Sequence, residues 1–155
     1  MKKTIDAFIA DKNLAIVGVS PRKENWGNAL MTELKKSDYN IVPVNPKFED
    51  INGVKCYPSV ADLPKEIENV IIAVNPDLAL EVAPEFRNSG VKRVWFQRGM
   101  GKGSYSEEAH KIFDDAGIEV IYGFCPMMFI GSGFHKFHFW IRRNLGKTPE
   151  GFSMN

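Results

Sequence analysis

Short apolar runs rich in β-branched residues alternate along the chain with longer amphipathic segments. The runs occupy residues 14–18, 41–44, 70–74, 94–97 and 119–122. None of them alternates with polar residues, so both faces of each predicted strand are expected to be buried, as in a parallel sheet. The pattern predicts an α/β protein with a Rossmann-like doubly wound parallel sheet of about five strands, covered on both faces as a three-layer α/β/α arrangement.

The segments between these runs have helical periodicity. Helices are predicted over residues 26–36, 78–88 and 106–116, with a shorter helical piece at 59–64. A further helix over residues 5–12 is expected to pack on the edge of the sheet.

Helix ends are indicated by their usual residues. Ser104 and Glu107 have the spacing of a capping box, and Gly90 and Gly117 are placed as helix stops. Pro84 is predicted to lie in the first turn of the middle helix, because proline fits poorly inside a helix.

Composition and charge restrict the class of protein. The chain has 155 residues, of which 44% are apolar, and 20 basic residues against 19 acidic ones give a net charge of +1. This balance argues against a nucleic-acid-binding protein. No apolar run is long enough to span a membrane, and Asp6 and Asp11 interrupt any signal-peptide core. Cys56 and Cys125 lack metal-site spacing and favour a reducing cytoplasm.

The chain is predicted to have a Rossmann-like domain over residues 1–126 and an extension over 127–155. Within the extension, an aromatic and basic helix is expected, with Phe134, Phe137, Ile141 and Leu145 on one stripe. We expect this stripe to pack on the same domain or on a second copy in a homodimer. Attachment to a membrane surface and base stacking on single-stranded nucleic acid stay open as alternatives.

In a doubly wound sheet, ligands bind beyond the carboxyl ends of the strands. After the first run, Gly18 allows close approach of the backbone, Ser20 offers a hydroxyl, and Arg22 and Lys23 supply positive charge next to a helix start. These features suit a phosphate group. A plain surface loop with a turn glycine is the alternative interpretation.

The dinucleotide fingerprint GxGxxG cannot be written over this loop, since Gly18 and Gly27 are too far apart. The second run ends at Asn45, where NAD-binding folds place an acidic residue for the ribose hydroxyls, and Lys47 follows. A lysine here favours a ligand with a phosphate on its ribose, which fits both NADP and coenzyme A (CoA). A solvated loop lysine is the alternative.

Several sequence stretches in order resemble a known family. They are Ala-Ile-Val-Gly-Val-Ser-Pro at 15–21, Val-Pro-Val-Asn-Pro at 42–46, Gly-Val-Lys-Cys-Tyr-Pro-Ser at 53–59 with Leu63 and Pro64, and Val-Trp-Phe-Gln at 94–97 with Gly99. The series resembles small stand-alone CoA-binding proteins, which are similar to the CoA-binding domain of the succinyl-CoA synthetase α subunit. The resemblance covers residues 13–126.

The resemblance implies that CoA binds in an extended pose along the strand ends. It assigns the phosphates to the loop residues Gly18, Val19, Ser20, Pro21, Arg22 and Lys23, and the entry to the helix to Asn25 and Gly27. The adenosine and its 3′-phosphate are assigned to Val44, Asn45, Pro46 and Lys47, with Tyr57 beside the nucleotide. The resemblance also implies that Val74, Asn75 and Pro76 border the pantetheine arm.

No residue set for catalysis is predicted. Acid–thiol ligases of the resembled kind need a phosphorylatable histidine in a second domain, which 155 residues do not accommodate. His135 and His138 are one helical turn apart but have no further ligand, so no metal site is expected. Cys125 carries a separate hypothesis, mixed-disulfide exchange with the CoA thiol. The sequence therefore predicts non-catalytic binding of CoA or a short acyl-CoA, with an NADP-binding reductase or redox sensor as the alternative.

Overall fold

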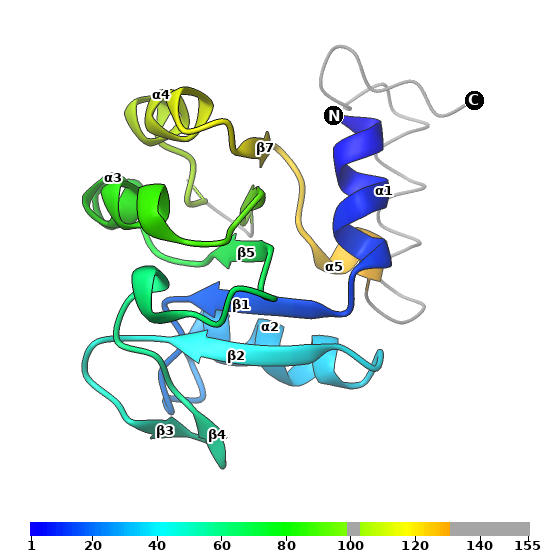
Figure 1. Ribbon diagram of the computed structural model, residues 1–155. Coiled ribbons are helices and arrows are strands. Elements are labelled where there is room, and N and C mark those ends of the chain that lie inside the picture. Colours follow the sequence, from blue (N-terminus) through cyan, green and yellow to red (C-terminus); the bar gives the residue numbers. More distant parts are fainter. Residues whose placement is uncertain (99–102, 131–155) are drawn as a thin grey trace.

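A five-stranded parallel sheet forms the centre of the protein. In this computed structural model, which describes residues 1–98 and 103–130, the strand order is β2-β1-β5-β6-β7 (Figure 1). The strands are β1 (Asn13–Val17), β2 (Asn40–Val44), β5 (Asn69–Ile72), β6 (Arg93–Phe96) and β7 (Glu119–Ile121). Each neighbouring pair is parallel, so the predicted fold class is confirmed.

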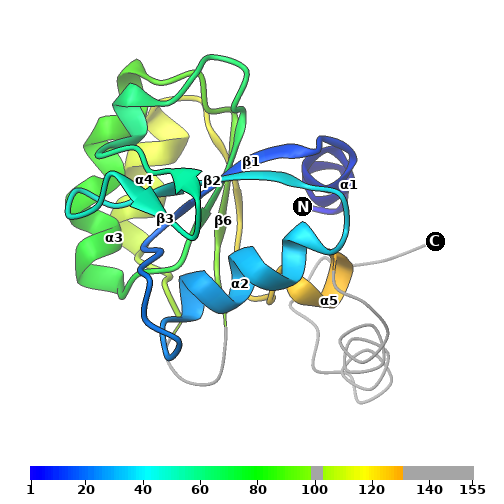
Figure 2. The same cartoon turned by 90° about the horizontal axis from the view of Figure 1, so that it is seen from below.

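Helices cover both faces of the sheet (Figure 2). One face carries α1 (Lys2–Ala10), α2 (Trp26–Lys35) and α5 (Met127–Ile130). The other carries α3 (Pro76–Val82), α4 (Glu107–Asp115) and the 3-10 helices η1 (Val60–Asp62) and η2 (Ala83–Asn88). Alternate strand residues enter separate cores: Ile16 and Ile71 pack with the first set, and Ala15 and Val70 with the second. The uninterrupted apolar strands of the sequence follow from this double burial.

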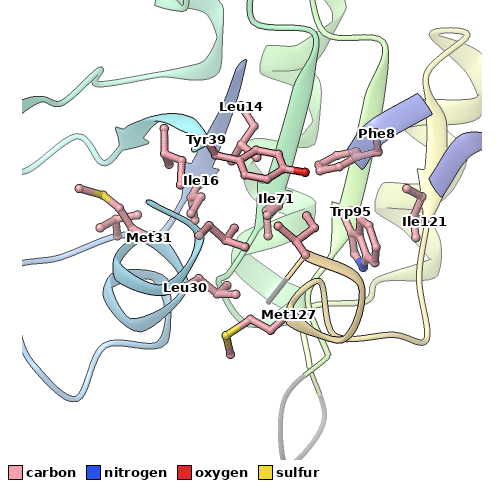
Figure 3. Packing of buried hydrophobic residues seen from close by; sticks show 14 of the residues in the cluster. Phe8, Leu14, Ile16, Leu30, Met31, Tyr39, Ile71, Trp95, Ile121 and Met127 are labelled. Atoms are coloured by element: carbon pink, nitrogen blue, oxygen red, sulfur yellow. The ribbon is translucent and has the colours of Figure 1, made fainter. Parts of the chain in front are cut away.

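The first core is built around large side chains (Figure 3). Phe8 of α1 and Trp95 of β6 meet edge to face, with ring centroids 5.2 Å apart. Thr4 Oγ1 also donates a hydrogen bond of 2.7 Å to Glu119 Oε2 on the edge strand β7. Helix α1 therefore reaches the edge of the sheet, as expected, and covers part of its face as well.

A small hairpin follows β2. Its strands β3 (Asp50–Ile51) and β4 (Val54–Lys55) turn through Asn52 and Gly53, whose φ angles are 54° and 78°. The chain then returns to the end of β2, where Tyr57 N donates to Pro43 O and Asn45 N donates to Tyr57 O. These bonds fix the backbone just where β2 ends.

Three predicted helix boundaries differ from the structure. The segment predicted as one helix over 78–88 is α3, which begins at Pro76, followed by η2. Pro84 lies in the first turn of η2 rather than of the α-helix, because proline has no N–H to continue α-helical bonding. Ser106, not Ser104, caps α4, and its Oγ accepts a hydrogen bond of 3.2 Å from Ala109 N. Gly90 follows the C-cap Ser89 of η2, but its φ is not positive, so it does not end the helix by a left-handed turn. A Cβ atom there would lie 2.7 Å from Lys65 O, so this glycine allows two segments to approach closely.

Some predictions fall outside the described residues. The aromatic and basic helix over 134–145 and the pair His135 and His138 are among them. The first four residues of the predicted extension form α5. Ser37, which follows α2, donates a hydrogen bond of 3.1 Å from its Oγ to Ile130 O. None of the helices in the described part of the chain has the length and apolar character needed to cross a bilayer.

Candidate functional site

The carboxyl ends of β1, β2 and β5 meet at the switch point of the sheet. Strand β1 leads into α2 on one face, whereas β5 leads into α3 on the other. The connections therefore diverge between β1 and β5, which leaves a crevice at this edge. The residues predicted to bind a ligand follow these strands.

The loop between β1 and α2 is held by the side chain of Asn25. Its Oδ1 accepts hydrogen bonds from Asn28 N at 2.8 Å and Ser20 N at 3.1 Å, and its Nδ2 donates to Gly18 O at 3.0 Å. Asn28 adds a bond of 2.8 Å from its Nδ2 to Ser20 O. Asn25 thus caps α2 and also ties the loop to the helix start.

Two glycines allow the close packing of this loop. Gly18 has a φ of +96°, and a Cβ atom there would lie 2.5 Å from Val74 Cγ1. A Cβ atom on Gly27 would lie 2.8 Å from Gly18 O. The loop can therefore lie flat against α2 and the end of β5 only with glycine at both positions.

The end of β2 is joined to the same loop. Asn45 Nδ2 donates a hydrogen bond of 2.8 Å to Val19 O, and Asn45 Oδ1 accepts one of 2.9 Å from Lys47 N. The amide of Asn45 is thus engaged with backbone groups and sets the direction of the chain at Lys47. The Lys47 side chain is exposed and forms no ion pair with any described residue.

A hollow of about 370 Å³ lies over the ends of β1, β2 and β5; we call it the switch-point hollow. Its walls are Val17, Gly18, Val44, Asn45, Pro46, Lys47, Pro58, Val60, Val74, Leu78, Glu81, Val82 and Glu85. The walls are mainly apolar, with Lys47 among the few charged groups. Glu85 is already bound within the fold, since its Oε2 accepts from Ser59 Oγ at 2.6 Å and Val60 N at 3.2 Å. Such a hollow suits a flat organic group, and an anion only where the ligand passes Lys47, since Glu81 and Glu85 also lie in the walls.

A second hollow, the arm hollow, continues along the same edge. It has a volume of about 440 Å³ and is lined by Trp26, Ala73, Val74, Asn75, Gln97, Gly103 and Ser104. Val74 lines both hollows. Trp26 and Leu78 are 38% and 43% exposed, which leaves apolar surface open to a ligand at this edge.

The structure brings together part of the predicted set. Gly18, Val44, Asn45, Pro46, Lys47 and Val74 line the switch-point hollow, Asn75 lines the arm hollow, and Ser20, Arg22 and Asn25 surround a third depression beside α2. The remaining predicted residues line none of these three hollows: Val19, Pro21, Lys23, Gly27, Tyr57 and Pro76. Val19 is fully buried in the first core, and the Lys55 ammonium lies 4.9 Å from the ring centroid of Tyr57.

Sequence reasoning missed the walls supplied by the helices. The sequence places Trp26, Leu78 and Val82 in amphipathic helices, and in the structure these side chains line the hollows. The sequence signal for Trp26 and Leu78 is an apolar side chain in the first turn of the helix that follows a strand, and it is weak without the fold. Gln97, which directly follows β6, could have been found by the strand-end rule.

Cys125 and His110 line neither the switch-point hollow nor the arm hollow. Cys125 packs against the first core, and burial raises the pKa of its thiol above the ordinary value of 9.0. A raised pKa disfavours the thiolate that disulfide exchange with CoA would need. His110 is half-buried on α4. Within residues 1–98 and 103–130, no group of three or more metal-ligating side chains occurs.

Comparison with known proteins adds to this geometry. The sequence model of the CoA binding domain matches residues 12–130, which include all five strands and both hollows. The chain belongs to this family. A structure described as a hypothetical protein from Pyrococcus horikoshii is 38% identical with a TM-score of 0.73, and the match covers 82% of this chain and 87% of that one.

Two relatives from the family differ in size. An ADP-forming acetate–CoA ligase of Methanocaldococcus jannaschii is 38% identical over 81 residues, which are 52% of this chain but only 12% of the ligase. An uncharacterized protein of Bacillus subtilis, YneT, is 28% identical over 74% of this chain and 82% of its own length. The resemblance of this chain to a CoA-binding domain is confirmed by these matches.

Proposed function

We propose that the protein binds CoA or a short acyl-CoA without catalysing a reaction on it, at the carboxyl ends of the parallel strands. The observation that carries the proposal is Lys47, a cation without a described ion-pair partner on the rim of the apolar switch-point hollow. A 3′-phosphate on the adenosine gives this cation an anionic partner, and the hollow gives the adenine an apolar surface. Membership of the CoA-binding domain family supports the same ligand.

The two hollows and the loop suggest how the ligand lies. The adenosine occupies the switch-point hollow, and the pyrophosphate lies on the loop that contains Ser20 and Arg22, next to the first turn of α2. The pantetheine arm then runs past Val74 into the arm hollow. Some predicted residues outside the hollows can still take part in binding. Val19 and Pro21 can do so through the loop backbone and Lys23 through its charge, while Gly27 allows the loop to lie close to α2.

The proposal is tested by titration calorimetry with CoA, dephospho-CoA, NADP and NAD. We expect CoA to bind more tightly than dephospho-CoA by about 1.5–3 kcal/mol, the size of a charge-assisted hydrogen bond. Lys47→Ala should remove most of this difference. Lys36→Ala is the matched control, because Lys36 pairs with Glu33 at the far end of α2.

Two outcomes would contradict the proposal. Tighter binding of NADP than of CoA would favour an NADP-binding reductase or redox sensor, which Lys47 can also serve through a 2′-phosphate. Equal binding of CoA and dephospho-CoA, unaffected by Lys47→Ala, would remove the role given to Lys47.

The setting and assembly of the protein belong to the same proposal. Cys56 and Cys125 are free thiols, which suits a reducing cytoplasm. A homodimer through residues 127–155 stays a prediction. Sedimentation of the full chain and of a version ending at residue 130 would measure it.

A further inference from the structure

A smaller hollow lies at the ends of β6 and β7, beyond the arm hollow. Its volume is about 230 Å³, and the side chains in its lining are those of Phe96, Gln97, Arg98, Ser104, Tyr105 and Tyr122. Three of these six are aromatic, and Arg98 is the charged one. We call it the aromatic hollow.

The rings of the aromatic hollow are held by one another and by α4. The centroids of Phe96 and Tyr105 are 5.3 Å apart in an edge-to-face contact, and those of Tyr105 and Tyr122 are 4.8 Å apart at 30°. Tyr105 Oη lies 3.1 Å from His110 Nδ1, and His110 Nε2 lies 3.5 Å from Asp114 Oδ1. Tyr105 is nevertheless 37% exposed, so part of this fixed aromatic surface is open.

The aromatic hollow continues the arm hollow. Both are lined by Gln97, Gly103 and Ser104, so a chain that fills the arm hollow leads into the aromatic one. Strands β1 and β7 are separated by three strand spacings, or about 14 Å. An extended pantetheine arm of about twelve bonds, at the rise per bond of an extended peptide, spans about 14 Å. An arm that begins at the loop after β1 therefore ends near the aromatic hollow.

We propose that the aromatic hollow receives the acyl group of an acyl-CoA and selects acyl groups that carry an aromatic ring. The inference rests on the proposed function and adds the class of acyl group to it. An aromatic ring on the thioester can stack on Tyr105 or Tyr122 at the 4.5–7 Å centroid separation that such pairs prefer. An acetyl group is too small to make these contacts, and a long aliphatic chain exceeds a hollow of this size.

The test compares four ligands by titration calorimetry on the full chain: CoA, acetyl-CoA, benzoyl-CoA and cyclohexanecarbonyl-CoA. The last two carry rings with the same number of carbon atoms, but only the benzoyl ring is flat and aromatic. We expect benzoyl-CoA to bind about tenfold more tightly than CoA or acetyl-CoA, and more tightly than the cyclohexane compound.

Variants locate the effect. Tyr122→Leu keeps an apolar side chain but removes a ring, so benzoyl-CoA should bind no better than the cyclohexane compound while CoA binding is unchanged. Tyr122→Phe keeps the ring and should keep the preference. Tyr105→Leu is the second variant, since its more exposed side chain contributes less to the core.

The outcomes separate this inference from the proposed function. If CoA binds and benzoyl-CoA binds no more tightly, the inference is overturned and the proposed function stands. Succinyl-CoA is added as a fifth ligand, because Arg98 also lines the hollow and can pair with a carboxylate. If succinyl-CoA binds most tightly of all, the hollow selects a carboxylate and the aromatic selection is overturned. If no CoA compound binds, the proposed function itself fails.

Discussion

Gly18 is the residue whose backbone the candidate site depends on most directly. Its φ of +96° disfavours any L side chain, and a Cβ atom would meet Val74 Cγ1 at 2.5 Å and Ala73 O at 3.0 Å. We expect Gly18→Ala to lower the free energy of unfolding by about 2–4 kcal/mol, the sum of backbone strain and overpacking. Urea denaturation measures this change.

Gly53 provides the matched control. It also has a positive φ, +78°, but a Cβ atom there would meet nothing within 4 Å. Gly53→Ala should therefore cost only the strain, about 1–2 kcal/mol. Equal losses in the two variants would show that the contact between Gly18 and the end of β5 is not tight.

Cys125 gives the stability of the protein a dependence on pH. Burial raises the pKa of its thiol above 9.0, so near and above pH 9 the unfolded chain releases this proton more readily than the folded chain. The unfolded state then binds fewer protons, and the free energy of unfolding falls as pH rises. Between pH 8 and pH 10, the free energy of unfolding should fall less for Cys125→Ala than for the unmodified protein, measured by urea denaturation with a reductant present. Parallel pH profiles for the two proteins would contradict this.

At the scale of elements, the two asparagine caps are unequal. Asn25 makes three hydrogen bonds to the backbone of the β1–α2 segment, whereas Asn75 caps α3 through its bond of 2.9 Å from Leu78 N. Asn25→Ala should cost about 2–3 kcal/mol of stability and weaken CoA binding, because the loop is released. Asn75→Ala should cost about 1 kcal/mol. Denaturation and CoA titration of both variants measure this, and equal costs would mean that Asn25 acts only as a helix cap.

The elements themselves could be predicted from the sequence to different degrees. The five strands of the parallel sheet could be predicted, because burial on both faces leaves an uninterrupted apolar run, and each of the five begins within one residue of its predicted start. The short hairpin strands β3 and β4 were not predicted. Helix ends were harder, since they depend on local bonding: Ser104 and Ser106 are both plausible caps until the chain after β6 binds Ser104 N to Gln97 O. The α-helical part of the middle helix likewise ends before Pro84, with Asn75 as its cap.

The candidate site could be predicted only in part for a related reason. Strand ends of a parallel sheet meet at one edge, so Gly18, Asn45, Lys47 and Val74 could be placed together from the sequence alone. The walls that α3 supplies could not be predicted from the sequence, because the direction in which Leu78 points depends on how α3 packs. The hydrogen bonds of the Asn45 amide with Val19 O and Lys47 N could not be predicted from the sequence either, because they depend on how the loop after β1 meets the end of β2.

At the scale of the whole molecule, different parts of the sheet provide the stabilising cores and the hollows proposed to bind a ligand. Its two faces carry the apolar cores, and the hollows lie along its carboxyl edge from β2 to β7. A ligand along this edge contacts segments that follow four different strands and are far apart in the sequence. Unfolding the chain would disperse these contacts, so such a ligand binds the folded state alone.

This arrangement predicts that CoA stabilises the entire fold. At a CoA concentration one hundred times Kd, mass action adds about 2.7 kcal/mol to the free energy of unfolding. For a domain of about 150 residues, this corresponds to a rise in Tm of about 5–10 °C, measurable by differential scanning calorimetry. Dephospho-CoA at the same concentration should raise Tm less than CoA does. In the Lys47→Ala variant, the two ligands should raise Tm by similar amounts. The contrary outcome is a CoA that binds in titration calorimetry but leaves Tm unchanged at this concentration. CoA would then bind the unfolded chain with similar affinity, which is incompatible with a site assembled from four strand ends.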